Sequence, residues 1–198
     1  EIEANAKIES PTPYKYPPML FYGSSITEGA HSSRPANSYS AIISNHLDVD
    51  YYNLGFSGSA KGEPEMADYI NTIDMSVFVL DYDHNAPNVE HLERTHEPFF
   101  LKIREKNPDL PIIMLTRPNC DYDNTSDARR AVIRRTYENA IARGDKNVYF
   151  INGKTFFGDS DRHLCTTDRT HPNDIGAYRM ALTIEPVLKK ILEEKYGK

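Results

Sequence analysis

Five short apolar runs, each separated from the next by a longer and more polar stretch, constrain the fold of this chain most strongly. The runs are rich in Val, Ile, Tyr and Phe and are continuous rather than alternating, which is typical of parallel strands buried on both faces. They cover residues 19–23, 50–55, 76–82, 111–117 and 147–153. Each run predicts one strand of a mostly parallel sheet.

The stretches between and after these runs carry helical periodicity. Helices are predicted near residues 37–47, 62–70, 88–106, 126–143 and 173–195. In the last of them Pro186 interrupts an apolar stripe and predicts a kink or a break near Glu185. Five strands with interleaved helices predict a three-layer α/β/α fold with a five-stranded, mostly parallel sheet.

The chain has 198 residues, which fits one ordinary domain, and we place it at 18–198. Residues 1–17 are polar and rich in proline, which predicts an extended arm or a linker to an additional domain upstream of residue 1. The sequence begins at Glu1 without a cationic and apolar leader, so we interpret it as a processed form or an excised piece. Localisation stays open between the bacterial cytoplasm and secretion.

Charge and composition exclude two function classes. The formal net charge of −6 argues against nucleic acid as a partner, which requires a basic face. No apolar stretch approaches the roughly 18 residues that a membrane-spanning helix needs. Cys120 and Cys165 are too few for a disulfide framework, and two free thiols are favoured over a single bridge.

Ligands of parallel α/β sheets bind outside the carboxyl ends of the strands, so the loop after each strand is a candidate site. The first loop reads GSSITEG. A phosphate-binding loop would need glycine in place of Glu28 and a lysine after it, and an α/β-hydrolase elbow would need glycine in place of Thr27. Two readings of the adjacent Ser24 and Ser25 remain, a nucleophile at a strand-to-helix turn or a helix N-cap.

The last loop, CTTDRTHPND, offers a base for such a serine. Asp168 precedes His171 by three residues, so its carboxylate could accept the Nδ1 proton and leave Nε2 free to face the serine. The alternative is a capping loop with a surface His and Asp, in which Asn173 or Asp174 caps the final helix.

Two further loops offer hydrogen-bond donors. Gly55 or Gly58 in NLGFSGSA could aim a backbone N–H into a cleft. Asn85 in LDYDHNAP could donate from its side-chain amide to an oxyanion, or could simply form an Asx-turn.

A metal site is the less favoured interpretation, and we expect no metal. Five potential ligands lie close together in sequence, but no HExxH motif accompanies them and two of the histidines are five residues apart, on different helix faces. They are Asp81, Asp83, His84, His91 and His96.

Four short blocks, in this order, resemble those of the SGNH hydrolases, also called GDSL-type esterases and lipases. GSSIT (23–27) resembles the first block, G-D-S-x-[ST], and NLGFSG (53–58) resembles the second, whose glycine donates a backbone N–H. YDHNA (82–86) resembles the third, G-x-N-D, and DRTH (168–171) resembles the D-x-x-H block. The resemblance covers about residues 19–195 and is nearest to the bacterial GDSL-like lipase/acylhydrolase group.

The resemblance implies a flavodoxin-like fold and a serine esterase without cofactor or metal. It implies a catalytic triad of Ser25, Asp168 and His171, and an oxyanion hole from the Ser25 N–H, Gly58 and Asn85. The implied substrate is a short-chain ester, with acetyl on a carbohydrate as the first choice. A thioesterase or lysophospholipase acting on longer chains is the alternative, and so is a catalytically silent binding module.

Three departures accompany the resemblance. Ser24 stands where the first block usually has aspartate, which is not a triad position. Asp83 replaces the glycine of the third block and Ala86 replaces its final aspartate. The shape of that loop, and with it the direction of Asn85, is therefore the weakest part of the resemblance.

Overall fold

The computed structural model describes residues 5–118 and 123–197. Its centre is a five-stranded sheet in the order β2-β1-β3-β4-β5, and all four neighbouring pairs are parallel. The strands are β1 (Met19–Gly23), β2 (Tyr51–Gly55), β3 (Val77–Asp81), β4 (Ile112–Leu115) and β5 (Val148–Ile151). The five predicted strands and the α/β class are confirmed, although four strands are shorter than predicted because their end residues already belong to loops.

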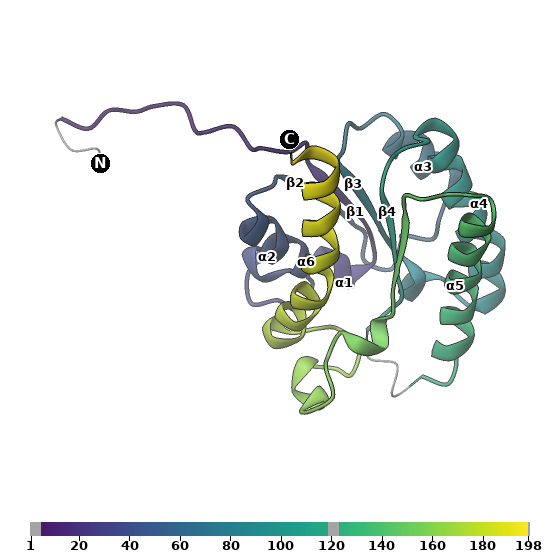
Figure 1. The fold of residues 1–198 in the computed structure, drawn as a ribbon. Coiled ribbons are helices and arrows are strands. Elements are labelled where there is room, and N and C mark those ends of the chain that lie inside the picture. Colours follow the sequence, from purple (N-terminus) through teal and green to yellow (C-terminus); the bar gives the residue numbers. More distant parts are fainter. Residues whose placement is uncertain (1–4, 119–122, 198) are drawn as a thin grey trace.

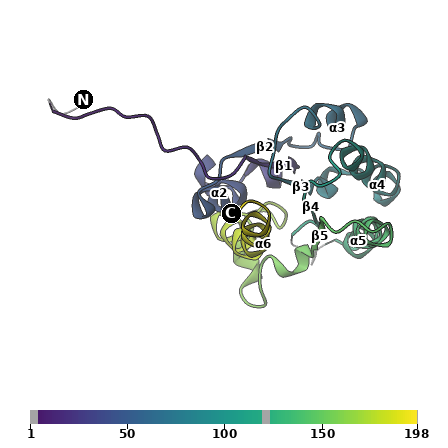
Figure 2. The same ribbon diagram turned by 45° about the horizontal axis from the view of Figure 1, so that its top comes forward.

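Helices cover both faces of the sheet (Figure 1). They are α1 (Ser25–Glu28), α2 (Tyr39–Leu47), α3 (Pro64–Ile70), α4 (Val89–Lys106), α5 (Ser126–Ala142) and α6 (Asp174–Tyr196). Figure 2 shows α2 and α6 on one face, with α3, α4 and α5 on the other. The three-layer sandwich is therefore confirmed.

Alternate residues of each strand enter two separate cores. Met19 and Phe21 of β1 pack with α2 and α6, whereas Leu20 and Tyr22 pack with α3, α4 and α5. All five residues of β1 and of β3 are buried. Burial on both faces explains why the strand sequences are continuous apolar runs without a period of two.

Of the two outcomes predicted at Pro186, the break is wrong, because α6 continues through the proline to Tyr196, and the kink stays a prediction. A proline inside a helix loses one backbone hydrogen bond and costs about 3 kcal/mol. Ile184, Leu188 and Ile191 are buried on both sides of the proline. Each such buried side chain contributes about 1.5–3 kcal/mol of hydrophobic stabilisation, which offsets the lost bond.

Residues 5–15 are exposed and contain no helix or strand, and Figure 1 shows them extending away from the α/β body. Tyr16 is the first residue to pack on that body, with its ring 6.2 Å from the ring of Tyr196. The division between arm and domain at residue 17 stays a prediction. None of the described helices is both long and apolar enough to cross a bilayer. Cys165 is a buried free thiol, while Cys120 lies outside the described residues.

Candidate active site

The two adjacent serines after β1 have different local roles. Ser24 is the N-cap of α1, and its Oγ accepts a hydrogen bond of 3.1 Å from the Ile26 N–H. Ser25 is the first residue of the helix, and its Oγ lies 2.8 Å from Nε2 of His171. The sequence left a helix cap and a contact with a histidine as alternatives for these serines. In the structure Ser24 caps the helix and Ser25 contacts the histidine.

The segment 166–172 is a tight loop that precedes α6. A β-bridge between Thr166 and Pro172 closes it, and Arg169 takes a left-handed conformation (φ 69°) near its middle. Asn173 follows as the N-cap of α6 and accepts hydrogen bonds from two backbone N–H groups of the first turn. Of the two predicted caps, Asn173 is therefore the one used.

This loop turns Asp168 and His171 toward each other. Oδ1 of Asp168 accepts the backbone N–H groups of Thr170 at 2.9 Å and His171 at 2.7 Å. Oδ2 lies 2.6 Å from Nδ1 of the His171 ring. Because an ionised carboxylate only accepts, Nδ1 carries the ring proton and Nε2 presents its lone pair to Ser25.

The pKa of Asp168 favours this ionised state. Desolvation raises the pKa, but the hydrogen bonds from the His171 ring and from the His171 and Thr170 N–H groups outweigh it. The pKa of the carboxyl therefore lies well below its ordinary value. Asp168 is consequently a fixed negative charge at the outer side of the imidazole.

The two candidate glycines after β2, Gly55 and Gly58, have different surroundings in the structure. Gly55 donates its N–H to Oδ1 of Asn53 at 2.9 Å, and a Cβ at Gly55 would lie 2.2 Å from the Glu28 N atom. Gly55 therefore allows β2 to pack closely on α1. Gly58 has a positive φ of 70° and lines the pocket beside Ser25, and its N–H donates to no group in the described part of the chain. Gly58 is the better placed donor.

Asn85 ends a short 3-10 turn, Asp83–Asn85, directly after β3. Its Nδ2 donates to the Phe56 carbonyl at 2.8 Å, which ties this loop to the one carrying Gly58. A side-chain amide has two N–H groups, so one remains for a ligand. The structure thus places Asn85 at the predicted pocket and gives it a second, structural task.

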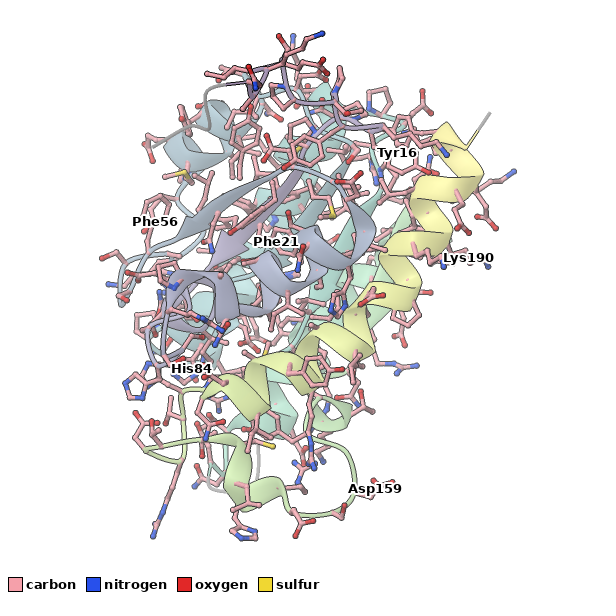
Figure 3. The ribbon with its side chains drawn as sticks, turned by 90° about the vertical axis from the view of Figure 1, so that its left-hand side faces the viewer. Tyr16, Phe21, Phe56, His84, Asp159 and Lys190 are labelled. Atoms are coloured by element: carbon pink, nitrogen blue, oxygen red, sulfur yellow. The ribbon has the colours of Figure 1, made fainter. Side chains whose placement is uncertain are left out.

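A shared pocket of about 610 Å³ joins these parts. Its lining is mostly polar and comes from the loops after β1, β2 and β3, from α5 and from the loop before α6. The lining includes Ser25, Gly58, His84, Asn85, Arg129 and His171. In Figure 3, Tyr16, which precedes β1, lies in the upper part of the molecule, and His84, which follows β3, lies in the lower part. The pocket is therefore at the carboxyl ends of the strands, where the fold class predicts a ligand.

Arg129 on α5 is a pocket residue that the sequence analysis missed. Its guanidinium, only 6% exposed, donates to the Asp83 carbonyl at 2.7 Å and to the Ala86 carbonyl at 2.9 Å. It therefore holds both ends of the turn that carries Asn85. Because its two bonds to this turn go to backbone carbonyls, no pairing of side-chain types in the sequence could have revealed them.

Asp83, one of the two departures in this loop, is buried and accepts a hydrogen bond of 3.1 Å from the Arg117 N–H. Burial raises the pKa of Asp83 to about 6, although that hydrogen bond and the charges of Arg117 and Arg129 lower it. The turn is thus held by the Arg129 guanidinium and by the bond between the Asp83 carboxylate and the Arg117 N–H. A G-x-N-D block has glycine at the position of Asp83 and therefore lacks this carboxylate.

Two histidines flank His171. The His84 ring lies 6.2 Å from it, nearly perpendicular, and burial, together with the charges of Arg117 and His171, lowers the pKa of His84 to about 4. The exposed His31 ring stacks on His171, with centroids 4.5 Å apart and planes 25° apart. His31 belongs to no sequence block and was also missed.

The five residues of the metal interpretation do not gather. Asp81 accepts hydrogen bonds from Thr27 and Tyr39 below the turn that carries Ser25. His91 contacts the Lys61 carbonyl at 2.8 Å, and His96 contacts the Thr136 hydroxyl at 3.0 Å inside the other core. That interpretation therefore has no geometric support among the described residues.

Comparison with known proteins gives one family match. The model of the GDSL-like Lipase/Acylhydrolase family matches residues 16–189. A search of curated proteins by sequence returns no significant match.

Solved structures give several matches. A GDSL-like lipase from Bacteroides ovatus is 33% identical with a TM-score of 0.82, covering 93% of this chain and 56% of its own. The salicylyl-acyltransferase SsfX3 of a tetracycline biosynthetic pathway is 22% identical with a TM-score of 0.78, covering 99% and 61%. A family 3 carbohydrate esterase from Clostridium thermocellum is 18% identical with a TM-score of 0.71, covering 91% and 99%. This chain therefore spans little more than half of the first two relatives.

Proposed function

Because the chain belongs to the GDSL-like lipase/acylhydrolase family, we propose that it is a serine esterase that removes a short acyl group from a carbohydrate. The family match confirms the resemblance found in the four sequence blocks. The observation that carries the proposal is the continuous contact from Ser25 Oγ through the His171 ring to the Asp168 carboxylate, at 2.8 and 2.6 Å.

The proposed reaction begins when Ser25 Oγ attacks the ester carbonyl. Nε2 of His171 takes the hydroxyl proton, and Asp168 holds the proton of Nδ1 and balances the imidazolium charge. Collapse of the tetrahedral intermediate breaks the bond to the alcohol, which leaves with the proton from Nε2. Water then attacks the acyl-enzyme with the same histidine as base, which releases the acid and restores Ser25.

Three donors would stabilise the oxyanion. They are the N–H of Ser25 at the start of α1, the N–H of Gly58 and the Nδ2 of Asn85. The first N–H groups of a helix have no partner inside the helix, so the Ser25 N–H is available to the substrate. Removing one such donor typically costs about 10²–10³-fold in rate.

A carbohydrate ester is the substrate class favoured by two considerations. The pocket is lined mainly by serine, asparagine, histidine and arginine, which suits a hydroxyl-rich alcohol better than a long acyl chain. Among structures of the same fold are a family two carbohydrate esterase from Clostridium thermocellum in complex with cellohexaose, and a two-domain esterase active on acetylated mannans. Acetyl is our first choice of acyl group by analogy with the second of these.

Hydrolysis of p-nitrophenyl acetate by the wild type, Ser25→Ala and Ser24→Ala tests the chemistry. We expect Ser25→Ala to be inactive and Ser24→Ala, which loses only a cap, to keep measurable activity. Equal rates for wild type and Ser25→Ala would refute the assignment. A panel of acetylated xylan, acetylated mannan and esters of increasing acyl length then tests the substrate, and a preference for long chains would favour a thioesterase or lysophospholipase.

A further inference from the structure

His31, Asp168 and His171 form the one cluster of three potential metal-binding side chains among residues 5–118 and 123–197. One ligand atom from each residue lies within 4.8 Å of the others. The cluster stands at the mouth of the proposed active site, and two of its members belong to the proposed triad. No step of the proposed hydrolysis uses His31. Its place in the cluster therefore raises the question whether this site binds a metal ion as well as the substrate.

The donor set is that of a zinc site. Two imidazoles and one carboxylate are a common ligand set for Zn²⁺, with metal–ligand bonds of about 2.0–2.2 Å and a fourth position for water. Ligand atoms around a tetrahedral ion are about 3.3 Å apart, as those bond lengths require. Binding therefore requires ligand atoms that now lie up to 4.8 Å apart to approach by up to about 1.5 Å. It also requires the 2.6 Å contact between Asp168 Oδ2 and His171 Nδ1 to open to about 3.3 Å, which partly exposed side chains can do.

His31 is the ligand that has to move, because its ring is stacked on His171 and stacked rings do not direct their lone pairs to one point. Its side chain is exposed, stacks on His171 and shares a hydrogen bond between Nδ1 and the Thr167 hydroxyl. Rotation of this side chain disturbs no core residue. The closed loop 166–172 holds the backbone of Asp168 and His171, so only their side chains have to shift.

We propose that His31, Asp168 and His171 bind a divalent transition-metal ion such as Zn²⁺, and that this ion inhibits the esterase. The binding stands on the geometry alone, whereas the inhibition rests on the proposed function. Ligation through Nδ1 of His171 moves the ring proton to Nε2, which then cannot accept the proton of Ser25. The ion therefore removes the base.

The first test is inhibition by Zn²⁺ of p-nitrophenyl acetate hydrolysis, with each variant normalised to its own metal-free rate. His31→Phe keeps a ring for the stack but no ligand, and His163→Phe removes another exposed histidine as a matched control. We expect His31→Phe to raise the half-inhibitory Zn²⁺ concentration about tenfold or more, since even outer-shell partners of a metal contribute about 10–100-fold to its affinity. His163→Phe should respond like wild type, and excess EDTA should restore activity.

The second test measures binding without catalysis, so that failure of the proposed function and failure of this proposal are distinguishable. Ser25→Ala, which keeps all three ligands, is titrated with Co²⁺ and with Zn²⁺, and the visible absorption of tetrahedral Co²⁺ and the heat of Zn²⁺ binding are followed. We expect one ion per chain, and loss of the signal in the Ser25→Ala/His31→Phe double variant. Absence of binding to Ser25→Ala, or identical Zn²⁺ inhibition of wild type and His31→Phe, would overturn the proposal.

Discussion

The two halves of the candidate active site are built differently. The nucleophile turn, Gly23–Thr27, is buried, and Thr27 and Tyr39 bond to the buried Asp81 beneath it. The base loop 166–172 is largely exposed, and one β-bridge and the backbone bonds to Asp168 hold it. The nucleophile is thus positioned by the core, whereas the base is positioned by local hydrogen bonds. Substitutions in the exposed base loop should therefore lower activity with little change in stability, whereas substitutions in the core beneath the nucleophile turn should lower stability.

The largest expected effect is a loss of activity on substitution of His171 in the exposed base loop. His171→Gln removes the proposed base, so kcat/KM for p-nitrophenyl acetate should fall by about 10⁴-fold or more, as it does in Ser-His-Asp enzymes that lose a triad member. The free energy of unfolding in urea should change little, because the residue is partly exposed and outside the core. A variant that loses stability in step with its activity would contradict the division between the two halves.

The nucleophile half should respond in the opposite way to loss of packing. Phe21 of β1 is fully buried, and its ring contacts those of Tyr39 and Tyr51 at 5.7 and 6.2 Å. Phe21→Ala should lower the free energy of unfolding by about 3–5 kcal/mol, because a large cavity replaces the ring. Urea denaturation measures this, and a loss below 1 kcal/mol would show that the core does not carry this turn.

A smaller effect on activity is expected at Asn85, which lines the pocket between the two halves. Asn85→Ala should lower kcat by about 10²–10³-fold if its amide holds the oxyanion. The variant also loses the bond to the Phe56 carbonyl, so Arg129→Gln serves as a comparison that loosens the same loop without removing the amide. If Arg129→Gln reduces kcat as much as Asn85→Ala does, the role of Asn85 is only structural.

The smallest effect is a difference in pH dependence between the halves. Burial raises the pKa of Asp81 to about 7, so the folded state keeps a proton that the unfolded state releases near pH 4. Its stabilisation is complete below the unfolded pKa and is lost as the pH rises toward 7. Asp168 has a lowered pKa, so its stabilisation is instead present above its unfolded pKa and is lost as the pH falls.

Asp81→Asn tests this sign, because asparagine retains an oxygen acceptor but does not titrate. From pH 5 to pH 8 the stability of the variant relative to wild type should rise by about 2.6 kcal/mol, because the wild type loses about two pKa units of stabilisation at 1.36 kcal/mol each. Urea unfolding of both proteins at the two pH values measures the change. A relative stability that stays constant would show that Asp81 does not titrate in this range.

Most of the framework could be predicted from the sequence, for an identifiable reason. Burial on both faces makes parallel strands continuous apolar runs, and the loops after them converge at one edge. Ser25, Gly58, Asn85 and His171 line one pocket, and they could be proposed from the sequence because each follows a strand or precedes a helix in a short block. Whether α6 continues through Pro186 or breaks there could not be decided from the sequence, because the outcome depends on tertiary packing that the local pattern does not contain.

The supporting residues of the site were beyond prediction for another reason. Arg129 acts on a backbone carbonyl 46 residues away in sequence, and a carbonyl is present at every position. His31 reaches Thr167 across 136 residues, and an isolated histidine in a loop carries no spacing that reveals such a contact. Sequence blocks therefore reveal groups that perform chemistry more readily than groups that hold them.

Labelling with a fluorophosphonate probe tests the central claim most directly, because the probe reacts with an activated serine whatever the natural substrate is. We predict one adduct per chain, mapped by mass spectrometry to Ser25, retained in Ser24→Ala and lost in both Ser25→Ala and His171→Gln. An adduct on Ser24, or no adduct on the folded wild type, would contradict the account.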